Sequence, residues 1–507
     1  MLNPQLINLL LLALHFGITL ILAATLNLWI DEAYTLNTTS QSVIHAIERS
    51  INYEIQPPLY FALLALWRRV NGSIFFARCF SVLCIGLAIL VTVSLSRRYL
   101  KGIASTHVTA VLAFHPYAIW AAVEIRSYAF SILLSTLLLK FFFDGFLADQ
   151  PDRRNQWLYG ATAIAALYTH YFLACLLASH AFVLLGLRRW RQLGIYLGMM
   201  TIVTATFLPL FSTLLLHLQG GGFYTEHSAQ TDLIGLRTAL GRFLIYLLPT
   251  AADWEGLNLM RVLRYGLISL LVYLVITWRY WLTQKQMILW IMTTITVLAF
   301  GLVLSVTNTV DLAYRYSYPL FIISILLTFS LLSLVQDRKQ QQRWMLGWAG
   351  LLVCGYLTSF WLTYMPLAKD GDWQRVSNYL MASEQPNQPI LVFSAEITLP
   401  LSYYYTGDNP VIPLPQPLNP DVYDQRAFVL TNPTEIETAL GQFPDRPSSL
   451  WLVTGPDYIV HGTAGQACTL LGFSFNCHIL EEFIDRYYSV VQTQSFYGSQ
   501  VRLLQRK

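Results

Sequence analysis

The chain has 507 residues, of which 55% are hydrophobic and only 12% are charged, and its mean hydropathy is +0.48. These values exclude a soluble globular protein and predict a polytopic membrane protein, because the length allows many spans. The formal net charge of +4 says little about partners, since lysines and arginines of membrane proteins mainly set topology, and no basic tail indicates nucleic acid.

The apolar stretches predict the spans. Residues 5–27 have neither a basic start nor a cleavage-like end, so we interpret them as a retained first span. Residues 40–50 and the segment from Pro57 to Val70 predict two short helices at the membrane interface. Further spans are expected near 73–96, 103–120, 127–147, 156–173, 174–188, 193–215, 262–281, 286–306, 316–335 and 344–366. The chain is therefore expected to cross the membrane about eleven times.

Basic residues recur in every second loop, which is the pattern of cytoplasmic loops. The clusters are Arg97-Arg98-Lys101, Arg153-Arg154, Arg188-Arg189-Arg191, Arg279 with Lys285, and Arg338-Lys339-Arg343. The alternate loops and everything after residue 366 are expected on the opposite side. The pattern predicts a cytoplasmic N-terminus, an extracytoplasmic C-terminal region and, in a bacterium, the inner membrane.

The composition changes near residue 367, where the sequence becomes polar and rich in proline. Short β-prone runs at 390–394, 427–431, 450–454 and 498–505, separated by turn residues, predict a soluble α/β domain over 367–507. Residues 1–366 form the predicted membrane domain, with an extracytoplasmic loop at 28–72. Two cysteines in the exported domain, Cys468 and Cys477, are close enough in sequence for a disulfide, and the sequence leaves open whether they form one.

Two adjacent carboxylates, Asp31 and Glu32, follow the first span directly. A charge at the edge of the hydrocarbon is costly, so carboxylates there usually have a function. The alternative is structural, with the pair forming the start of an interfacial helix.

The predicted topology gathers many ionisable residues on one side of the membrane. They are Asp31, Glu32, Glu54, Arg78, Glu124, Arg126, His170, Arg237, Arg242, Asp311 and Arg315. We find no zinc-ligand spacing, glycine-rich phosphate loop or nucleophile elbow, so this mixed cluster is the candidate site. The long loop at 217–260 is interpreted as a flap over a lipid substrate, with a plain surface helix as the alternative.

Several motifs in this order resemble a known family. They are WIDEAY from Trp29, QPPLYF from Gln56, ARCFSVLCIG from Ala77, HPYAIWAAVEIRSYA from His115, LYTHYF from Leu167, AYRYSYP from Ala313 and DWQRVSNYL from Asp372. The chain resembles the GT-C glycosyltransferases of the protein O-mannosyltransferase and aminoarabinose-transferase type, glycosyltransferase family 39 in its bacterial form. One departure is Gln56, where the family usually has histidine or lysine.

The resemblance implies a GT-C fold and inverting transfer of one sugar from a polyprenyl phosphate to an acceptor hydroxyl. Asp31 would be the general base, and Glu32 its helper or the ligand of a divalent ion, if one is used. Such a displacement needs a carboxylate that takes a proton and a cation that holds the departing phosphate, and these residues supply both. The acceptor, whether lipid, polysaccharide or protein, stays open, as do the sugar and any metal requirement.

The donor phosphate would meet Arg126, Arg315 and Arg78, of which Arg315 has the better case. Glu124 and Arg126 could instead form a structural ion pair, and Arg78 could be an interfacial anchor. His170 could donate to the acceptor, bind a metal, or simply pack among aromatic residues. The expected substrate-site residues are Glu124, Gln56, Tyr60, His170 and Tyr128.

Three other functions are weighed. A lipid or glycan transporter would show charges deep in several spans and a repeat between the halves, and neither is evident. A noncatalytic envelope scaffold leaves the clustered acids and arginines unexplained. A ligase or polymerase that moves a preassembled lipid-linked oligosaccharide is the alternative enzyme.

Overall fold

The computed structural model describes residues 3–100, 105–218, 234–247, 284–307, 313–332, 337–419, 425–443, 445–455, 469–470 and 473–507. The chain divides into two compact units. The first contains the described residues of 1–23, 56–218 and 229–363, and the second contains those of 24–55 and 364–507. We describe each unit by itself.

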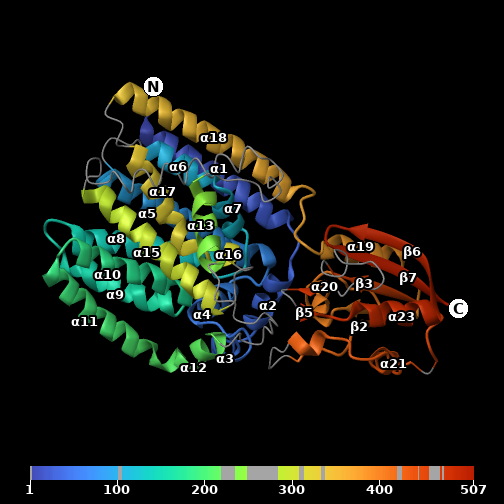
Figure 1. The fold of residues 1–507 in the computed structure, drawn as a ribbon. Helices are drawn as coiled ribbons and strands as arrows, with labels where there is room; N and C mark the ends of the chain where they lie inside the picture. Colours follow the sequence, from blue (N-terminus) through green and yellow to red (C-terminus); the bar gives the residue numbers. More distant parts are fainter. Residues whose placement is uncertain are drawn as a thin grey trace. The chain divides into compact units, whose positions relative to one another are not determined.

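The first unit is helical (Figure 1). Its α-helices are α1 (Pro4–Thr25), α4 (Leu59–Arg68), α5 (Ile74–Tyr99), α6 (Ser105–Phe114), α7 (Pro116–Ala122), α8 (Tyr128–Phe142), α9 (Arg153–Leu167), α10 (Ala174–Gly186), α11 (Trp190–Phe207), α12 (Phe211–Leu218), α13 (Ile234–Leu247), α15 (Gln284–Thr307), α16 (Ala313–Tyr316), α17 (Tyr318–Leu332) and α18 (Arg338–Tyr364). Three short helical turns adjoin them: η1 (Phe143–Leu147), η2 (Tyr171–Leu173) and η3 (Leu208–Leu210).

Five helical stretches among the described residues are long and apolar enough to cross a membrane. They are Pro4–Thr25, Ile74–Tyr99, Tyr128–Leu147, Trp190–Leu216 and Gln286–Thr307. The predicted span at 103–120 is two helices, because Pro116 lacks the N–H that would continue α6 and instead starts α7. The span predicted at 262–281 lies outside the described residues, and the total of eleven stays a prediction.

One large apolar core holds these helices together. The helix α5 packs against α8, and α8 packs against α9, while α10 and α13 both pack against α15.

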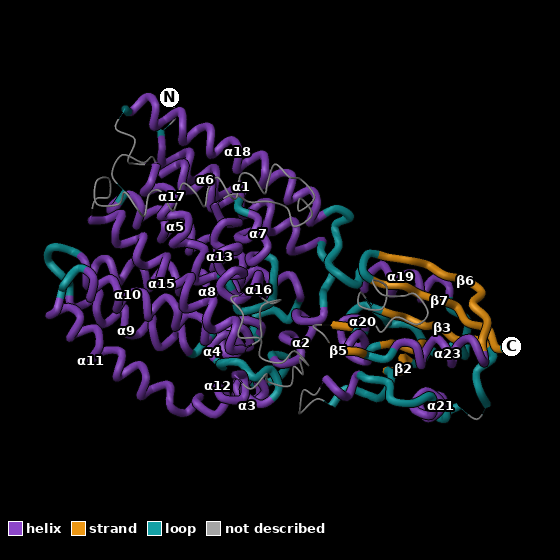
Figure 2. The backbone as a smooth tube through the Cα atoms, viewed as in Figure 1, coloured by secondary structure: helices purple, strands orange, loops and turns teal. Residues whose placement is uncertain are grey.

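The second unit combines short helices with a mixed sheet (Figure 2). The helices α2 (Ile30–Thr38) and α3 (Val43–Asn52) come first; α3 matches the short helix expected at 40–50 and is capped by Ser42. The later elements are α19 (Trp373–Ser383), β1 (Ile390–Phe393), η6 (Ala395–Ile397), α20 (Thr398–Leu401), β2 (Val411–Pro413), η7 (Gln425–Phe428), α21 (Thr434–Leu440), β3 (Ser449–Thr454), β4 (Thr469–Leu470), β5 (Phe473–Ser474), α23 (Cys477–Tyr487), β6 (Tyr488–Phe496) and β7 (Ser499–Arg506).

The five-stranded sheet has the order β2-β1-β3-β7-β6. The strand β1 runs parallel to β2 and β3, and β7 runs antiparallel to β3 and β6. Alternate side chains enter two different cores: Leu391 packs on one face with residues of α23, and Val392 packs on the other with residues of α19. Both faces of the central strands are therefore covered.

Three of the four predicted strands are present, as β1, β3 and β7. The run expected at 427–431 is not a strand, since its first residues belong to η7, which ends at Phe428. The Leu430 N–H donates to the Phe475 carbonyl at 3.4 Å without forming a strand. Cys477, at the start of α23, is disulfide-bonded. Its predicted partner Cys468 lies outside the described residues, so the pairing stays a prediction.

Candidate functional site

The two carboxylates occupy the first turn of α2. The helix begins after Trp29, whose backbone is extended and whose side chain makes no capping hydrogen bond. Acidic side chains in a first turn are stabilised by those N–H groups and by the helix dipole. The structural alternative is therefore satisfied in part, although neither acid is itself the N-cap.

Asp31 and Glu32 differ in exposure and in partners. Glu32 is 0% exposed, and its Oε1 lies 3.0 Å from the Nζ of Lys369, which is itself 9% exposed. Asp31 is half-buried. The ion pair therefore commits Glu32 to Lys369, while Asp31 keeps part of its surface accessible.

A set of hydrogen bonds fixes the same segment against residues 369 and 404. The Lys369 N–H donates to the Asn27 Oδ1 at 2.6 Å, and the Asn27 Nδ2 donates to the Lys369 carbonyl at 3.2 Å. The Leu28 N–H donates to the hydroxyl of Tyr404 at 2.8 Å. Because these bonds flank the start of α2, they set where its first turn, and hence Asp31, is placed.

The acid pair does not fit a divalent metal ion. A metal at Glu32 would have to displace the ammonium of Lys369, which lies within salt-bridge distance of its carboxylate. Among the described residues, no group of three histidine, cysteine, aspartate or glutamate side chains is placed to hold a metal. We therefore derive no step through a metal.

Sequence reasoning missed two residues near this segment. Lys369 had only one signal, its position just before the Asp372 motif. Glu396, which lies in η6 and is 7% exposed, accepts hydrogen bonds from the hydroxyls of Tyr34 and Ser394, both at 3.4 Å, and nothing in the sequence marked it. Tyr53 packs against Tyr34, and burial raises the pKa of Tyr53 to about 12, so it stays neutral.

In the first unit, Arg78 is 0% exposed and its Nη1 donates to the Ala23 carbonyl at 3.0 Å. The interfacial anchor considered from sequence would keep the guanidinium in the polar interface, whereas this one is buried. Ser81, one turn further along α5, donates to the Glu124 carbonyl at 2.6 Å. The α7–α8 loop is thereby held over the face of α5 that carries Arg78.

That loop brings its own charges into the interior. Glu124 is 2% exposed and Arg126 is 7% exposed. Tyr128 follows at the start of α8, and its ring stacks on Trp120 with centroids 4.8 Å apart. A buried charge is costly unless it pairs with an opposite charge or binds a ligand. Buried charges are therefore typical of functional sites and of structural ion pairs.

Arg315 lies beside the same aromatic group. The Tyr117 hydroxyl donates to the Arg315 carbonyl at 3.3 Å. Its neighbour Tyr314 packs on Trp120 at 4.8 Å, and its neighbour Tyr316 packs on Tyr128 at 6.5 Å. The Arg315 side chain is half-buried. The structure thus places Arg315 and the loop of Arg126 around one aromatic cluster.

His170 is 1% exposed and packs its ring on Phe172, Tyr316 and Tyr318. Its Nδ1 accepts from the Phe172 N–H at 3.5 Å, which caps η2. The His170 ring therefore packs among aromatic residues, as one of the alternatives from sequence supposed. The contact with Tyr316 also brings His170 next to the segment that carries Arg315.

The corner at Gln56 joins this region through the main chain. The Leu59 N–H donates to the Tyr168 carbonyl at 2.9 Å. Tyr60 is 1% exposed and packs on Phe80 of α5, and Gln56 is half-buried. The contacts described above therefore connect four segments of the first unit, which are those around Tyr60, Arg126, His170 and Arg315. Asp31 and Glu32 belong to the second unit.

The predicted flap is described only at α13. Arg237 is exposed there, and the guanidinium of Arg242 lies 5.4 Å from the centroid of the Tyr314 ring. Residues 219–233 and 248–283, and also Asp311, lie outside the described residues. The flap therefore stays a prediction.

No protein-family model and no curated protein matches this sequence. Solved structures do match. ArnT from Cupriavidus metallidurans, bound to undecaprenyl phosphate, is 13% identical with a TM-score of 0.50, over 98% of this chain and 97% of that chain. Its apo state gives 14% identity and a TM-score of 0.48, over 98% and 97% of the two chains.

The archaeal oligosaccharyltransferase AglB from Archaeoglobus fulgidus, in complex with an inhibitory peptide and a dolichol-phosphate, is 11% identical with a TM-score of 0.49, over 98% of this chain and 74% of that chain. At 13% identity the first ArnT structure shows the fold alone: the chain shares the fold of ArnT over 98% of its length, as the motifs led us to expect.

Proposed function

We propose that this protein is an inverting membrane glycosyltransferase that moves a single sugar from a polyprenyl-phosphate donor to an acceptor hydroxyl on the extracytoplasmic side. The observation that carries the proposal is the fold shared with ArnT over nearly the whole of both chains. That ArnT structure holds undecaprenyl phosphate, which supports a polyprenyl phosphate as the donor lipid.

The reaction can be written with this chain's residues. The acceptor hydroxyl gives its proton to the Asp31 carboxylate while its oxygen attacks the anomeric carbon of the donor sugar. The bond from that carbon to the phosphate oxygen breaks, and polyprenyl phosphate leaves with the electron pair. Attack opposite the leaving group inverts the anomeric configuration.

The arginines supply the positive charge for the departing phosphate. A guanidinium presents a planar pair of donors that matches a phosphate, and its contribution is larger at a desolvated site. Arg315 and Arg126 flank one aromatic cluster, which supports a shared phosphate site with Arg315 as its principal group. Arg78 has a lesser role in this proposal, since its Nη1 already donates to the Ala23 carbonyl.

The two acids have separate roles. Glu32 is paired with Lys369 and completely buried, which supports a role in positioning α2 rather than in proton transfer. Asp31 is accessible in part, as a general base must be if it is to meet an acceptor hydroxyl. We assign Lys369 and Asn27 as positioning residues for Asp31.

A transfer assay with the purified full-length protein tests the proposal. The donor is a radiolabelled polyprenyl-phosphate monosaccharide, and a bacterial envelope extract supplies the acceptor. We expect each acceptor molecule to gain one labelled sugar, linked to it with the opposite anomeric configuration. Transfer of a preassembled oligosaccharide in one step would replace this function by that of a ligase. Transport of the intact lipid without sugar release would exclude an enzyme.

The extracytoplasmic placement has its own test. We expect a reporter that is active only in the cytoplasm to be silent after Lys507 and active when inserted near Arg343, because the basic loops are retained inside. The reverse pattern would move the proposed chemistry to the cytoplasmic side.

A further inference from the structure

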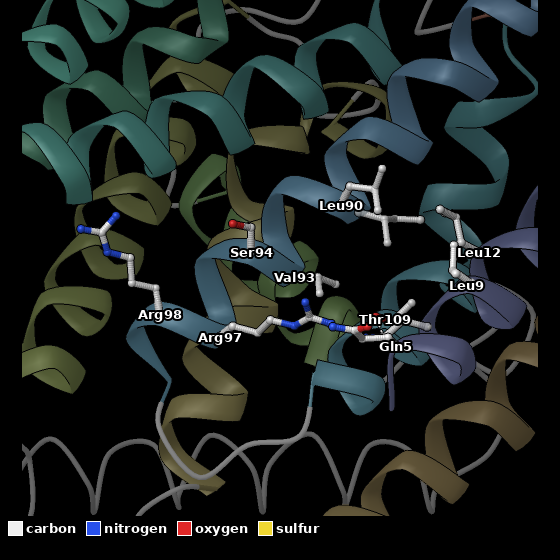
Figure 3. Close-up of a pocket in the computed structure, with 11 residues that line it drawn as sticks. Gln5, Leu9, Leu12, Leu90, Val93, Ser94, Arg97, Arg98 and Thr109 are labelled. Atoms are coloured by element: carbon white, nitrogen blue, oxygen red, sulfur yellow. Dashed lines mark hydrogen bonds between the residues drawn. The ribbon is translucent and has the colours of Figure 1, made fainter. Parts of the chain in front are cut away.

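A cavity of about 600 Å³ lies between α1, α5 and α6, apart from every residue assigned above (Figure 3). Its lining has two chemical parts. Leucine, isoleucine and valine side chains of α1 and α5, among them Leu9, Ile89 and Leu90, form an apolar part. Gln5, Asn8, Ser94, Arg97, Arg98 and Thr109 form a polar part. An apolar wall next to a cationic polar wall is the chemistry that an amphiphile matches.

Hydrogen bonds between helices build the polar part. The Asn8 Nδ2 of α1 donates to the Ser105 Oγ at 3.1 Å, and the Thr109 Oγ1 donates to the Asn8 Oδ1 at 2.9 Å. The apolar part opens at its rim, where Leu9 is 63% exposed and Leu90 is 51% exposed. Both leucines lie on helices that can cross a membrane, so the rim faces lipid.

The two arginines of the lining differ. Arg98 pairs with the buried carboxylate of Asp144 at 2.9 Å, and its side chain points away from the cavity in Figure 3. Arg97 is exposed, extends across the cavity toward Gln5 and Thr109, and makes no hydrogen bond or ion pair with the residues that the structure describes. None of the described residues that line the cavity is acidic. Among these residues, the Arg97 guanidinium faces no carboxylate and lies beside an apolar wall.

We propose that this cavity binds an anionic phospholipid of the surrounding bilayer. The phosphate accepts from the Arg97 guanidinium, the glycerol and ester groups meet the amide and hydroxyl side chains of the polar part, and the first acyl carbons lie on Ile89 and Leu90. A volume of about 600 Å³ holds the headgroup region and the upper chain, and the remaining chain stays in the bilayer through the open rim. Basic pockets between membrane helices select anionic headgroups in this way.

Native mass spectrometry of the full-length protein tests the proposal. Phosphatidylglycerol and phosphatidylcholine are added in equal amounts, and the bound lipid is identified by its mass. We expect wild-type protein to retain phosphatidylglycerol preferentially. Arg97→Gln should reduce that preference by about fivefold, the contribution of one basic residue near a membrane surface. Arg97→Lys should keep most of it. Leu90→Trp, which narrows the apolar part, should lower retention of both lipids.

Arg191→Gln is the matched control, because Arg191 is also an exposed arginine of a predicted cytoplasmic cluster but does not line the cavity. It should leave the lipid preference unchanged. Equal loss in both glutamine variants, or unchanged preference in Arg97→Gln, would overturn the proposal. Displacement of phosphatidylglycerol by added polyprenyl phosphate, with loss of donor binding in Arg97→Gln, would assign the cavity to the donor instead. Because lipid retention is measured without sugar transfer, failure of the proposed enzyme leaves this test intact.

Discussion

The acid segment, residues 27–38, and the arginine segments, residues 123–128 and 313–318, carry the two parts of the proposed chemistry and are fixed by different forces. Polar bonds hold the acid segment: a buried ion pair, an asparagine that bonds a neighbouring main chain, and a tyrosine hydroxyl. Ring packing around Trp120 holds the arginine segments, together with single hydrogen bonds to the Glu124 and Arg315 carbonyls. A buried ion pair is thus central to the first region and aromatic packing to the second.

This difference determines how each region tolerates change. Removing one partner of a buried ion pair leaves an uncompensated charge, which is among the most destabilising changes that one substitution can make. Replacing one ring of an aromatic cluster removes packing but strands no charge. We therefore expect one substitution in the acid segment to cause a large loss of folding stability, and one substitution in the arginine segments to cause a small one.

The largest effect on stability is expected at Lys369. Lys369→Met removes the ammonium group that pairs with the completely buried carboxylate of Glu32, and it should destabilise the protein by about 3–5 kcal/mol. Thermal unfolding of the purified protein measures the loss. Adding Glu32→Leu to this variant should restore most of the stability, because both charges are then removed.

Arg446→Met is the matched control for Lys369→Met, because it also removes the cation of an ion pair. It breaks the pair with Glu437, at 3.3 Å, in which the remaining carboxylate is 43% exposed, so its cost should be much smaller. Equal costs in the two single variants would show that burial of Glu32 does not govern the acid segment.

The next effect concerns donor affinity. Arg315→Ala should weaken binding of the polyprenyl-phosphate sugar by about 1–3 kcal/mol, and Arg315→Lys by less, because lysine keeps the charge but loses the planar donor pair. Arg126→Ala should follow in the same direction with a smaller loss. Binding of labelled donor to purified protein measures both. Unchanged affinity in Arg315→Ala would place the phosphate elsewhere.

The smallest effect is expected at Trp120, whose ring lies 4.8 Å from both Tyr128 and Tyr314. Trp120→Leu should weaken donor binding by about 0.5–1.5 kcal/mol, the usual contribution of an aromatic pair, and Trp120→Phe by less. Both variants should remain folded. A loss of folding stability in Trp120→Leu as large as that in Lys369→Met, measured by thermal unfolding, would remove the distinction between the two regions.

Much of the helical fold could be predicted because a membrane span has a strong signal, about 20 apolar residues in sequence. The helices α1, α5 and α15 lie where the apolar stretches indicated. The strand β6 was missed, since its side chains are exposed from Ser489 to Ser495 and show no alternation of apolar and polar residues. The strand β2 was too short to be recognised.

The candidate site was predictable in part. Asp31, Arg126 and Arg315 stand in motifs, and charges next to apolar stretches are conspicuous. The pairing of Glu32 with Lys369 was not predictable, because the two residues are far apart in sequence and no local pattern couples them. The sequence suggested Glu32 as a helper or metal ligand, and only the fold brought the lysine to it.

The most direct test of the account is the turnover of Asp31→Asn. Asparagine keeps the shape of the side chain but cannot take the acceptor proton, so sugar transfer should fall by a factor of about 10²–10⁴, while donor binding stays nearly unchanged. Glu48→Gln, which removes an exposed carboxylate from α3 of the same unit, should keep wild-type turnover. Full transfer by folded Asp31→Asn would contradict the assignment of the base, and so would a loss of donor binding in step with turnover.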